Sequence, residues 1–187
     1  MVERRSPKPS VEVRFLVGPP LCMSESLEKQ IKNDTYQVFL MASPATLPVS
    51  FALHPWLVIN QKGNISRYGV GRYNSEEGRK FFGSHTCEHC SGHLHKNAKP
   101  PSEGLEIYPY SRPRYWNGKI LGKVEGGEGS LAQKMTESVS QSTTYYPHRN
   151  RYSLLGPNSN TYVQWVLNQF PESGLRLPWN AFGKNSI

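Results

Sequence analysis

Apolar and aromatic residues gather in runs of strand length through the first third of the chain. Four such runs are residues 11–17, 36–41, 51–60 and 65–71. Runs of four to eight residues rich in β-branched and aromatic side chains are typical of strands. The turn residues Gln61–Asn64 separate the last two runs. We therefore predict a β-hairpin over residues 51–71.

Three other stretches repeat their apolar residues at helical spacing. These residues are Leu27 and Ile31; Leu131, Met135 and Val139; and Val163, Val166, Leu167 and Phe170. Ser24 is a suitable N-cap for the first helix, and Asn158 or Ser159 for the third. Pro171 should end the third helix because proline interrupts helical hydrogen bonding. The sequence thus predicts three helices among the strands.

Glycine, proline, histidine, lysine and serine dominate from about residue 74 to about residue 129. Strand-like fragments interrupt this stretch at 105–108 and 119–124, and the rest reads as long loops. A chain of 187 residues suits one domain. We predict an N-terminal tail with a short strand at 1–20. Residues 21–187 should form one α+β domain, an antiparallel sheet with packed helices and a loop-rich insertion at about 74–129.

The distribution of charged and of apolar residues excludes some classes of partner and location. The net charge is +8, but no run of five basic residues and no nucleic-acid motif occurs, so we expect no specific nucleic-acid partner. Residues 39–59 carry no formal charge, yet three prolines interrupt them, so we expect no membrane span. The N-terminus lacks the apolar segment of a signal peptide, and three cysteines make no secreted disulfide framework. The expected location is the cytoplasm.

Residues 145–155 are rich in aromatic and apolar side chains and suit a short extended segment. The segment Gly156–Tyr162 joins it to the start of the third predicted helix. Its sequence is Gly-Pro-Asn-Ser-Asn-Thr-Tyr. Backbone N–H groups at a helix start have no partner within the helix, so they can stabilise a carboxylate, phosphate or oxyanion. The other interpretation is an asparagine or serine cap with no further role.

This segment resembles the C-terminal signature of a bacterial family of unknown function, number three-seven-five-zero in the domain series. The resemblance extends to Phe170-Pro-Glu and to Leu177-Pro-Trp-Asn-Ala-Phe-Gly-Lys-Asn. It also includes His54-Pro-Trp56 and the pair Arg67-Tyr68, although Pro55 departs from the family pattern. The stretch 74–129 lies outside this resemblance.

The chain is similar, more distantly, to permuted papain-like hydrolases of the NlpC/P60-like and deSUMOylating-isopeptidase-like groups. Those enzymes place a histidine at a strand start, then a hairpin, then a cysteine at a helix start. Here His54 precedes the hairpin, and Ser159 stands where those enzymes have cysteine. The resemblance implies a permuted papain-like architecture with a Ser/His site.

The resemblance assigns Ser159 as nucleophile and His54 as its base, with the helix-start amides stabilising the oxyanion. A serine hydroxyl gains far less than a thiol from the field of a helix start, so it needs a good base. His54 could equally be a buried histidine with a local hydrogen bond. Further candidate ligand-binding residues are Asn158, Asn160, Arg67 and Lys184. For the two asparagines and Lys184, capping and solvation are equally compatible with the pattern.

A second cluster of chemically active residues runs from His85 to His95. Cys87 and Cys90, three apart, precede His93 and His95. Thiolate and imidazole are the ligands that Zn²⁺ prefers. The alternatives are a solvent loop with incidental thiols, or a redox pair of the two cysteines.

The sequence favours a hydrolase or acyl-transfer enzyme acting on an unidentified small-molecule, peptide or acyl substrate. One alternative is a non-catalytic binding module that uses the same pocket for a carboxylate or phosphate. Another is an interaction protein stabilised by zinc.

Overall fold

The computed structural model describes residues 12–14, 26–71, 89–91, 93–108 and 114–186. Within them, one antiparallel sheet has the strand order β1-β9-β2-β3-β4-β6-β5. Its strands are β1 (Glu12–Arg14), β2 (Tyr36–Pro44), β3 (Leu53–Gln61), β4 (Asn64–Val70), β5 (His89–Ser91), β6 (Leu94–Lys96) and β9 (Lys119–Gly126). A separate pair consists of β7 (Glu103–Glu106) and β8 (Tyr115–Asn117).

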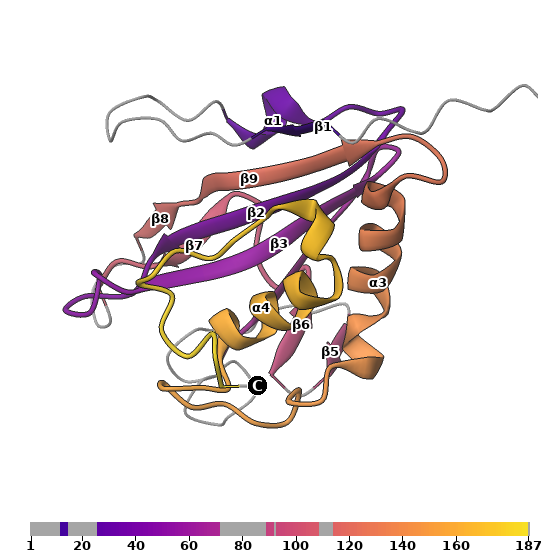
Figure 1. The fold of residues 1–187 in the computed structure, drawn as a ribbon. Coiled ribbons are helices and arrows are strands. Elements are labelled where there is room, and N and C mark those ends of the chain that lie inside the picture. The colour runs from indigo at the N-terminus through magenta and orange to yellow at the C-terminus, as the bar shows by residue number, and fades with distance from the viewer. Residues whose placement is uncertain (1–11, 15–25, 72–88, 92, 109–113, 187) are drawn as a thin grey trace, which may run out of the picture.

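Two helices, α3 and α4, cover one face of the sheet, and the short helix α1 lies on the other side (Figure 1). The elements are α1 (Leu27–Gln30), α3 (Leu131–Tyr145), α4 (Ser159–Gln169) and a 3-10 turn at Pro171–Ser173. Leu57 and Ile59 of β3 pack with Met135 of α3 and Val163 of α4 in the larger core. Because successive side chains of a strand point to opposite faces, this leaves Trp56 and Val58 for the other face.

The second face has its own smaller core. Trp56 and Val58 pack there with Leu27 of α1 and Phe39 of β2. The β7–β8 pair lies over the end of β2 on this side, because Leu105 N donates to Ser43 Oγ at 3.2 Å. The sheet is therefore covered on both faces, which explains why β2 and β3 read as nearly continuous apolar runs.

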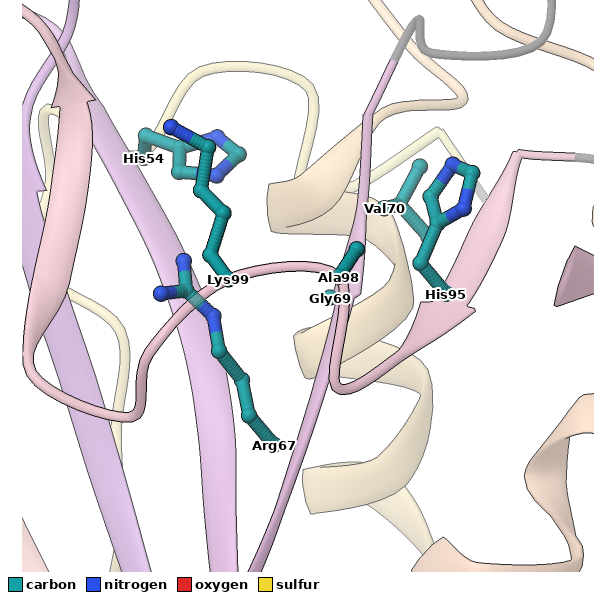
Figure 2. Close-up of a pocket in the computed structure, with 7 residues that line it drawn as sticks. All are labelled: His54, Arg67, Gly69, Val70, His95, Ala98 and Lys99. Atoms are coloured by element: carbon teal, nitrogen blue, oxygen red, sulfur yellow. The ribbon is translucent and has the colours of Figure 1, made fainter. Parts of the chain in front are cut away.

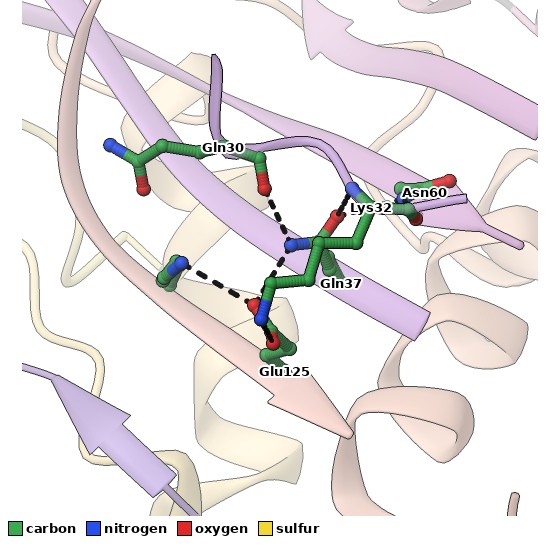
Figure 3. Close-up of polar contacts among 6 residues, drawn as sticks. Gln30, Lys32, Gln37, Asn60 and Glu125 are labelled. Atoms are coloured by element: carbon green, nitrogen blue, oxygen red, sulfur yellow. Dashed lines mark hydrogen bonds and ion pairs between the residues drawn. The ribbon is translucent and has the colours of Figure 1, made fainter. Parts of the chain in front are cut away.

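A buried polar network fastens α1 and the following turn to the sheet (Figure 3). Gln37 is fully buried and donates to Gln30 O at 2.8 Å and to Glu125 Oε2 at 2.9 Å. Its own oxygen accepts from Asn60 Nδ2 at 2.7 Å and from Lys32 N at 3.0 Å. Lys32 also forms an ion pair with Glu125. Every polar group of the Gln37 side chain is thus paired.

The predicted antiparallel α+β fold with packed helices is confirmed. The hairpin is present as β3 and β4, with Lys62 and Gly63 at positive φ in the turn. The third helix has its N-cap at Asn158 and ends before Pro171. In the first helix Ser26 occupies the N-cap position, but its side chain makes no capping hydrogen bond; Ser24 lies outside the described residues.

Two local expectations differ from the structure. Residues 119–126 form β9, which pairs with β2 inside the sheet, so the later part of the predicted insertion supplies a central strand. The predicted extended segment at 145–155 forms no strand, because α3 continues to Tyr145 and turns follow it. Tyr146 is buried there against Tyr162. Among the described residues, no helix is long and apolar enough to cross a bilayer.

Candidate functional site

His54 begins the buried part of β3 and shares the Trp56 face of the sheet. Its ring centroid lies 6.1 Å from that of Trp56, and its side chain is buried. Position 54 is two residues before Trp56, so strand alternation places both side chains on the face opposite α4. Figure 2 shows the His54 ring on the same side as the ends of the Lys99 and Arg67 side chains, which line the same cavity.

A cavity of about 20 Å³ opens beside His54 (Figure 2). Its lining residues are His54, Arg67, Gly69, Val70, His95, Ala98 and Lys99. Two of these have cationic side chains, and two are histidines. A cavity of this size accommodates a group about as large as a water molecule. The site is therefore small, and its lining combines apolar surface with these four nitrogen-bearing side chains.

Arg67 forms one wall of this cavity and is only 5% exposed. Its guanidinium carbon lies 4.2 Å from the centre of the Trp56 ring, which is a cation–π contact. Nη1 donates to the carbonyl oxygens of Pro100, at 2.6 Å, and of Glu103. The residue thus holds the loop before β7 against the sheet.

Lys99 forms another wall and is 7% exposed. Its Nζ lies 3.4 Å from Glu103 Oε1, 3.3 Å from Gly104 O and 4.3 Å from the centre of the Tyr115 ring. Burial lowers the pKa of Lys99, whereas the Glu103 carboxylate opposes that change. The charge of Arg67 also lowers the pKa of Lys99, and the charge of Glu106 raises it.

The surroundings keep His54 neutral. Burial and then the charges of Arg67 and Lys99 lower its pKa from 6.5 to about 3. A neutral imidazole offers one N–H donor and one acceptor. At neutral pH His54 can therefore donate a hydrogen bond to an anion without adding charge to the cavity.

At the start of α4, two backbone N–H groups are already hydrogen-bonded to a side chain of the protein. Asn158 Oδ1 accepts from the backbone N–H groups of Asn160, at 2.9 Å, and Thr161, at 3.3 Å. Asn158 N in turn donates to Thr161 Oγ1 at 3.0 Å, which completes a capping box. Two amides that could stabilise an oxyanion are thus already paired.

The C-terminal segment closes over the same helix start. Asn160 Nδ2 donates to Phe182 O at 2.7 Å, and Thr161 Oγ1 donates to Gly183 O at 2.7 Å. Asn158 Nδ2 donates to Phe182 O at 3.2 Å. The two signature segments noted in the sequence, 156–161 and 177–185, therefore bind each other. Their carbonyl oxygens present negative partial charge, which disfavours an anion at this helix start.

The structure does not bring His54 and Ser159 together. Ser159 is buried at the first position of α4, a helix that packs on the Leu57 face. Asn160 Nδ2 reaches the carbonyl of Leu53 at 3.2 Å, so the backbones are neighbours. Strand alternation nevertheless places the His54 side chain on the opposite face, and the cavity that it lines does not include Ser159. No hydrogen bond joins the two side chains within the described ranges.

The remaining predicted ligand-binding residues lie at three places: the cavity, the start of α4 and the C-terminal segment. Arg67 lines the cavity, whereas Asn158 and Asn160 lie at the α4 cap. Lys184 donates to the carbonyls of Leu177, at 3.2 Å, and Pro178, at 3.0 Å, so it fastens the C-terminal segment. Asn160 Oδ1 is buried with no hydrogen-bond partner among the described residues.

The structure describes the side chains of two of the four predicted zinc ligands. His93 Nδ1 and His95 Nε2 both approach Gly71 O, at 3.2 and 3.3 Å. The backbone of Cys90 pairs with that of His95, but the Cys90 side chain and Cys87 lie outside the described residues. The described residues alone contain no group of three metal-binding side chains.

Sequence reasoning missed Lys99 as a site residue. It lies in the run Asn97-Ala-Lys-Pro-Pro within the loop-rich stretch, where nothing distinguishes it from a solvated lysine. Its burial depends on the β7–β8 pair and on Tyr115, which are brought over β2 by tertiary contacts. His95 was predicted as a metal ligand, and the structure additionally places it in the cavity wall.

A protein-family model described as "Protein of unknown function (DUF3750)" matches residues 92–186. The match includes the segment 156–161 and the C-terminal segment, and it also covers residues 92–129 of the predicted insertion. His54 and Arg67 precede it. Neither the curated proteins nor the solved structures include a match to this chain.

Proposed function

The chain belongs to the DUF3750 family of proteins of unknown function, and we propose that it is a binding module for a carboxylate or similar anionic group. The observation that carries this proposal is the burial of two like charges, Arg67 and Lys99, in the lining of one cavity. Like charges that are buried near one another repel. An anion in the cavity would reduce that repulsion.

The cavity size limits how such a ligand enters. About 20 Å³ takes one oxygen-sized group, so one oxygen of a carboxylate enters while the rest of the ligand stays outside. Lys99 contributes charge, and neutral His54 contributes an N–H donor. Arg67 contributes charge from a guanidinium whose Nη1 already faces two carbonyls.

Titration with sodium acetate tests the proposal. Thermal unfolding is followed at constant ionic strength, with sodium chloride replaced stepwise by acetate, because a ligand of the folded state raises the unfolding midpoint. The test variant is Lys99→Met, which keeps the length of the side chain and removes its charge. The matched control is Lys134→Met on the exposed side of α3. We expect the acetate-dependent rise to disappear in Lys99→Met and to persist in the control.

Two outcomes overturn the proposal. The first is an unfolding midpoint that does not change with acetate, phosphate or sulfate in the unmodified protein. The second is an equal rise in both variants, because that would place the anion elsewhere on a basic surface. Nuclear magnetic resonance of the His54 ring gives an independent readout, since an anion beside it raises its pKa.

A Ser159-dependent hydrolase or acyltransferase in a permuted papain-like architecture is the competing proposal. The chain order of His54, hairpin and capped helix supports it, whereas the opposite orientation of the His54 side chain counts against it. A serine-directed fluorophosphonate probe distinguishes the two proposals. Labelling at Ser159 that is lost in His54→Gln would favour the enzyme. A folded, unlabelled protein would favour the binding module.

Zinc binding by Cys87, Cys90, His93 and His95 is a third proposal. The His93 and His95 rings both lie beside Gly71 O, so they are near each other, which favours it. The ring nitrogens that do not donate to Gly71 O would then be the ligands, because a nitrogen that donates a hydrogen bond carries a proton. Elemental analysis after purification without chelators should then give about one zinc per chain. Cys90→Ser should lose that zinc, and Cys22→Ser is the matched control. A metal-free protein that fails to rebind zinc would refute this proposal.

A further inference from the structure

Five large apolar side chains are exposed where three separate segments meet. They are Phe51, Leu154, Leu155, Trp179 and Phe182, and we call them the apolar loop cluster. Trp179, Leu154 and Leu155 are 80–82% exposed, and Phe51 is 64% exposed. Soluble proteins expose single apolar residues freely, but a contiguous group of this kind marks an interaction surface.

Specific contacts join the three segments into one surface. The rings of Phe51 and Phe182 meet edge to face with centroids 6.0 Å apart, and those of Trp179 and Phe182 are 6.4 Å apart. Asn158 Nδ2 donates both to Leu154 O, at 3.0 Å, and to Phe182 O. In Figure 1 the C-terminal segment, in yellow, runs back to the β2–β3 loop and returns beside the loop before α4.

The backbone beneath the cluster is firmly held. Asn180 Nδ2 donates to Phe51 O at 2.9 Å, and Leu53 N donates to Asn180 O at 3.1 Å. Ser186 Oγ donates to Leu155 O at 3.0 Å. The side chains are therefore presented outward by anchored loops, so binding through them would require little ordering of the chain.

The charges in these segments all have one sign. Residues 44–53, 149–156 and 176–186 contain Arg149, Arg151, Arg176 and Lys184 and no aspartate or glutamate, although the whole chain has 14 acidic residues. Arg151 and Arg176 are exposed. Exposed tryptophan, phenylalanine and leucine with cations alongside are the combination that enters the interface of an anionic bilayer.

We propose that the apolar loop cluster docks this protein on the surface of an anionic phospholipid bilayer. Trp179, Phe51 and the two leucines enter the headgroup region, and Arg151 and Arg176 contact lipid phosphates. The shape supports a bilayer as the occupant, because the cluster consists of side chains at the tips of loops. A flat bilayer receives such tips without needing a complementary protein surface.

Co-sedimentation of the full chain with vesicles tests this docking. Vesicles of phosphatidylcholine alone are compared with vesicles that contain phosphatidylglycerol. The test variant is Trp179→Ser combined with Leu155→Ser. The matched control is Tyr145→Ser, which removes an aromatic residue 69% exposed on α3. We expect binding to anionic vesicles to fall by about tenfold or more in the test variant and to stay unchanged in the control.

The charges and the orientation are tested separately. Arg151→Gln with Arg176→Gln should weaken the binding and reduce its dependence on salt, whereas Lys134→Gln should not. Tryptophan emission should shift to shorter wavelength on vesicle binding, because Trp179 is far more exposed than the fully buried Trp56. Trp179→Phe should abolish that shift. Lys99→Met should leave vesicle binding intact, so this result is separable from the fate of the anion pocket.

Four outcomes would overturn the docking proposal. Absence of binding to anionic vesicles is the first, and equal binding to neutral and anionic vesicles is the second. The third is a dimer in sedimentation velocity that dissociates in Trp179→Ser with Leu155→Ser, because the cluster would then be an interface between copies of the chain. Basic residues at the N-terminus, such as Arg4 and Arg5, remain in every variant. Vesicle binding that survives all the cluster variants would also count against the proposal.

Discussion

The guanidinium of Arg67 lies over the indole of Trp56, with 4.2 Å between its central carbon and the ring centre. Both side chains reach the same loop, because Arg67 Nη1 donates to Pro100 O at 2.6 Å and Trp56 Nε1 donates to Pro101 O at 2.9 Å. This pair therefore attaches residues 97–103 to the sheet and shapes the cavity that Lys99 completes.

Replacement of Arg67 should destabilise the protein strongly. Arg67→Met removes the partners of two carbonyl groups and the cation–π contact, so we expect a loss of about 2–4 kcal/mol in the free energy of unfolding. Arg67→Lys should also lose stability, because an ammonium cannot stack and bond in the same plane. Urea denaturation measures both. Arg176→Lys, on the surface, is the control and should change stability by no more than about 0.5 kcal/mol.

Acid should destabilise the fold through His54. Its pKa is about 3 in the folded protein and 6.5 ordinarily, so between these pH values the unfolded chain binds a proton that the folded chain does not. Stability is present above pH 6.5 and is lost as the pH falls, by about 2–3 kcal/mol at pH 4.5. Unfolding in urea at pH 7.5 and pH 4.5 measures the loss.

His54→Gln isolates this contribution. The lowered pKa of Glu125 produces a separate acid-dependent loss in both proteins, so the difference between them reports His54 alone. We expect the variant to show a smaller decrease between pH 7.5 and pH 4.5. An identical decrease in both proteins would mean that His54 does not remain neutral in the fold.

The Gln37 network should behave as one unit. Gln37→Ala leaves the side chains of Asn60 and Glu125 short of a partner, so we expect a loss of about 2–4 kcal/mol. Asn60→Ala should cost a similar amount, because Asn60 also accepts from Gly63 N at 2.7 Å. The double variant should lose less than the sum of the two, and a double-mutant cycle in urea measures the difference. Strict additivity would contradict a shared network.

Gly183 should tolerate no side chain. Its φ is +85°, and a Cβ would lie 2.6 Å from Asn158 Nδ2 and 2.9 Å from Leu155 O. Gly183→Ala should therefore open the contact between the C-terminal segment and the α4 cap, at a cost of about 2 kcal/mol or more. Gly127→Ala is the matched control, since a Cβ there meets nothing within 4 Å. Thermal unfolding of both variants tests the difference.

Local patterns predicted the elements well where the signal lies in neighbouring residues. The spacing of Val163, Val166 and Leu167 together with Asn158 is sufficient for α4, and the turn at Gly63 is sufficient for the hairpin. By contrast, β9 lies in a stretch rich in glycine and lysine, and its place between β1 and β2 depends on pairing with distant strands. A composition shift could not reveal that pairing.

The sequence by itself determined the residue types that could act, their helices and strands, and the antiparallel hairpin at His54, because these depend on side-chain periodicity and capping within a few residues. The tertiary structure decided which of them meet. Ser159 is buried at a helix cap closed by residues 182–183. His54 lies on the other face of the sheet, where it lines one cavity with Arg67 and Lys99. The physical reason is strand alternation. The position of a residue along β3 determines which face of the sheet its side chain occupies, but the residues that pack on that face come from distant parts of the chain.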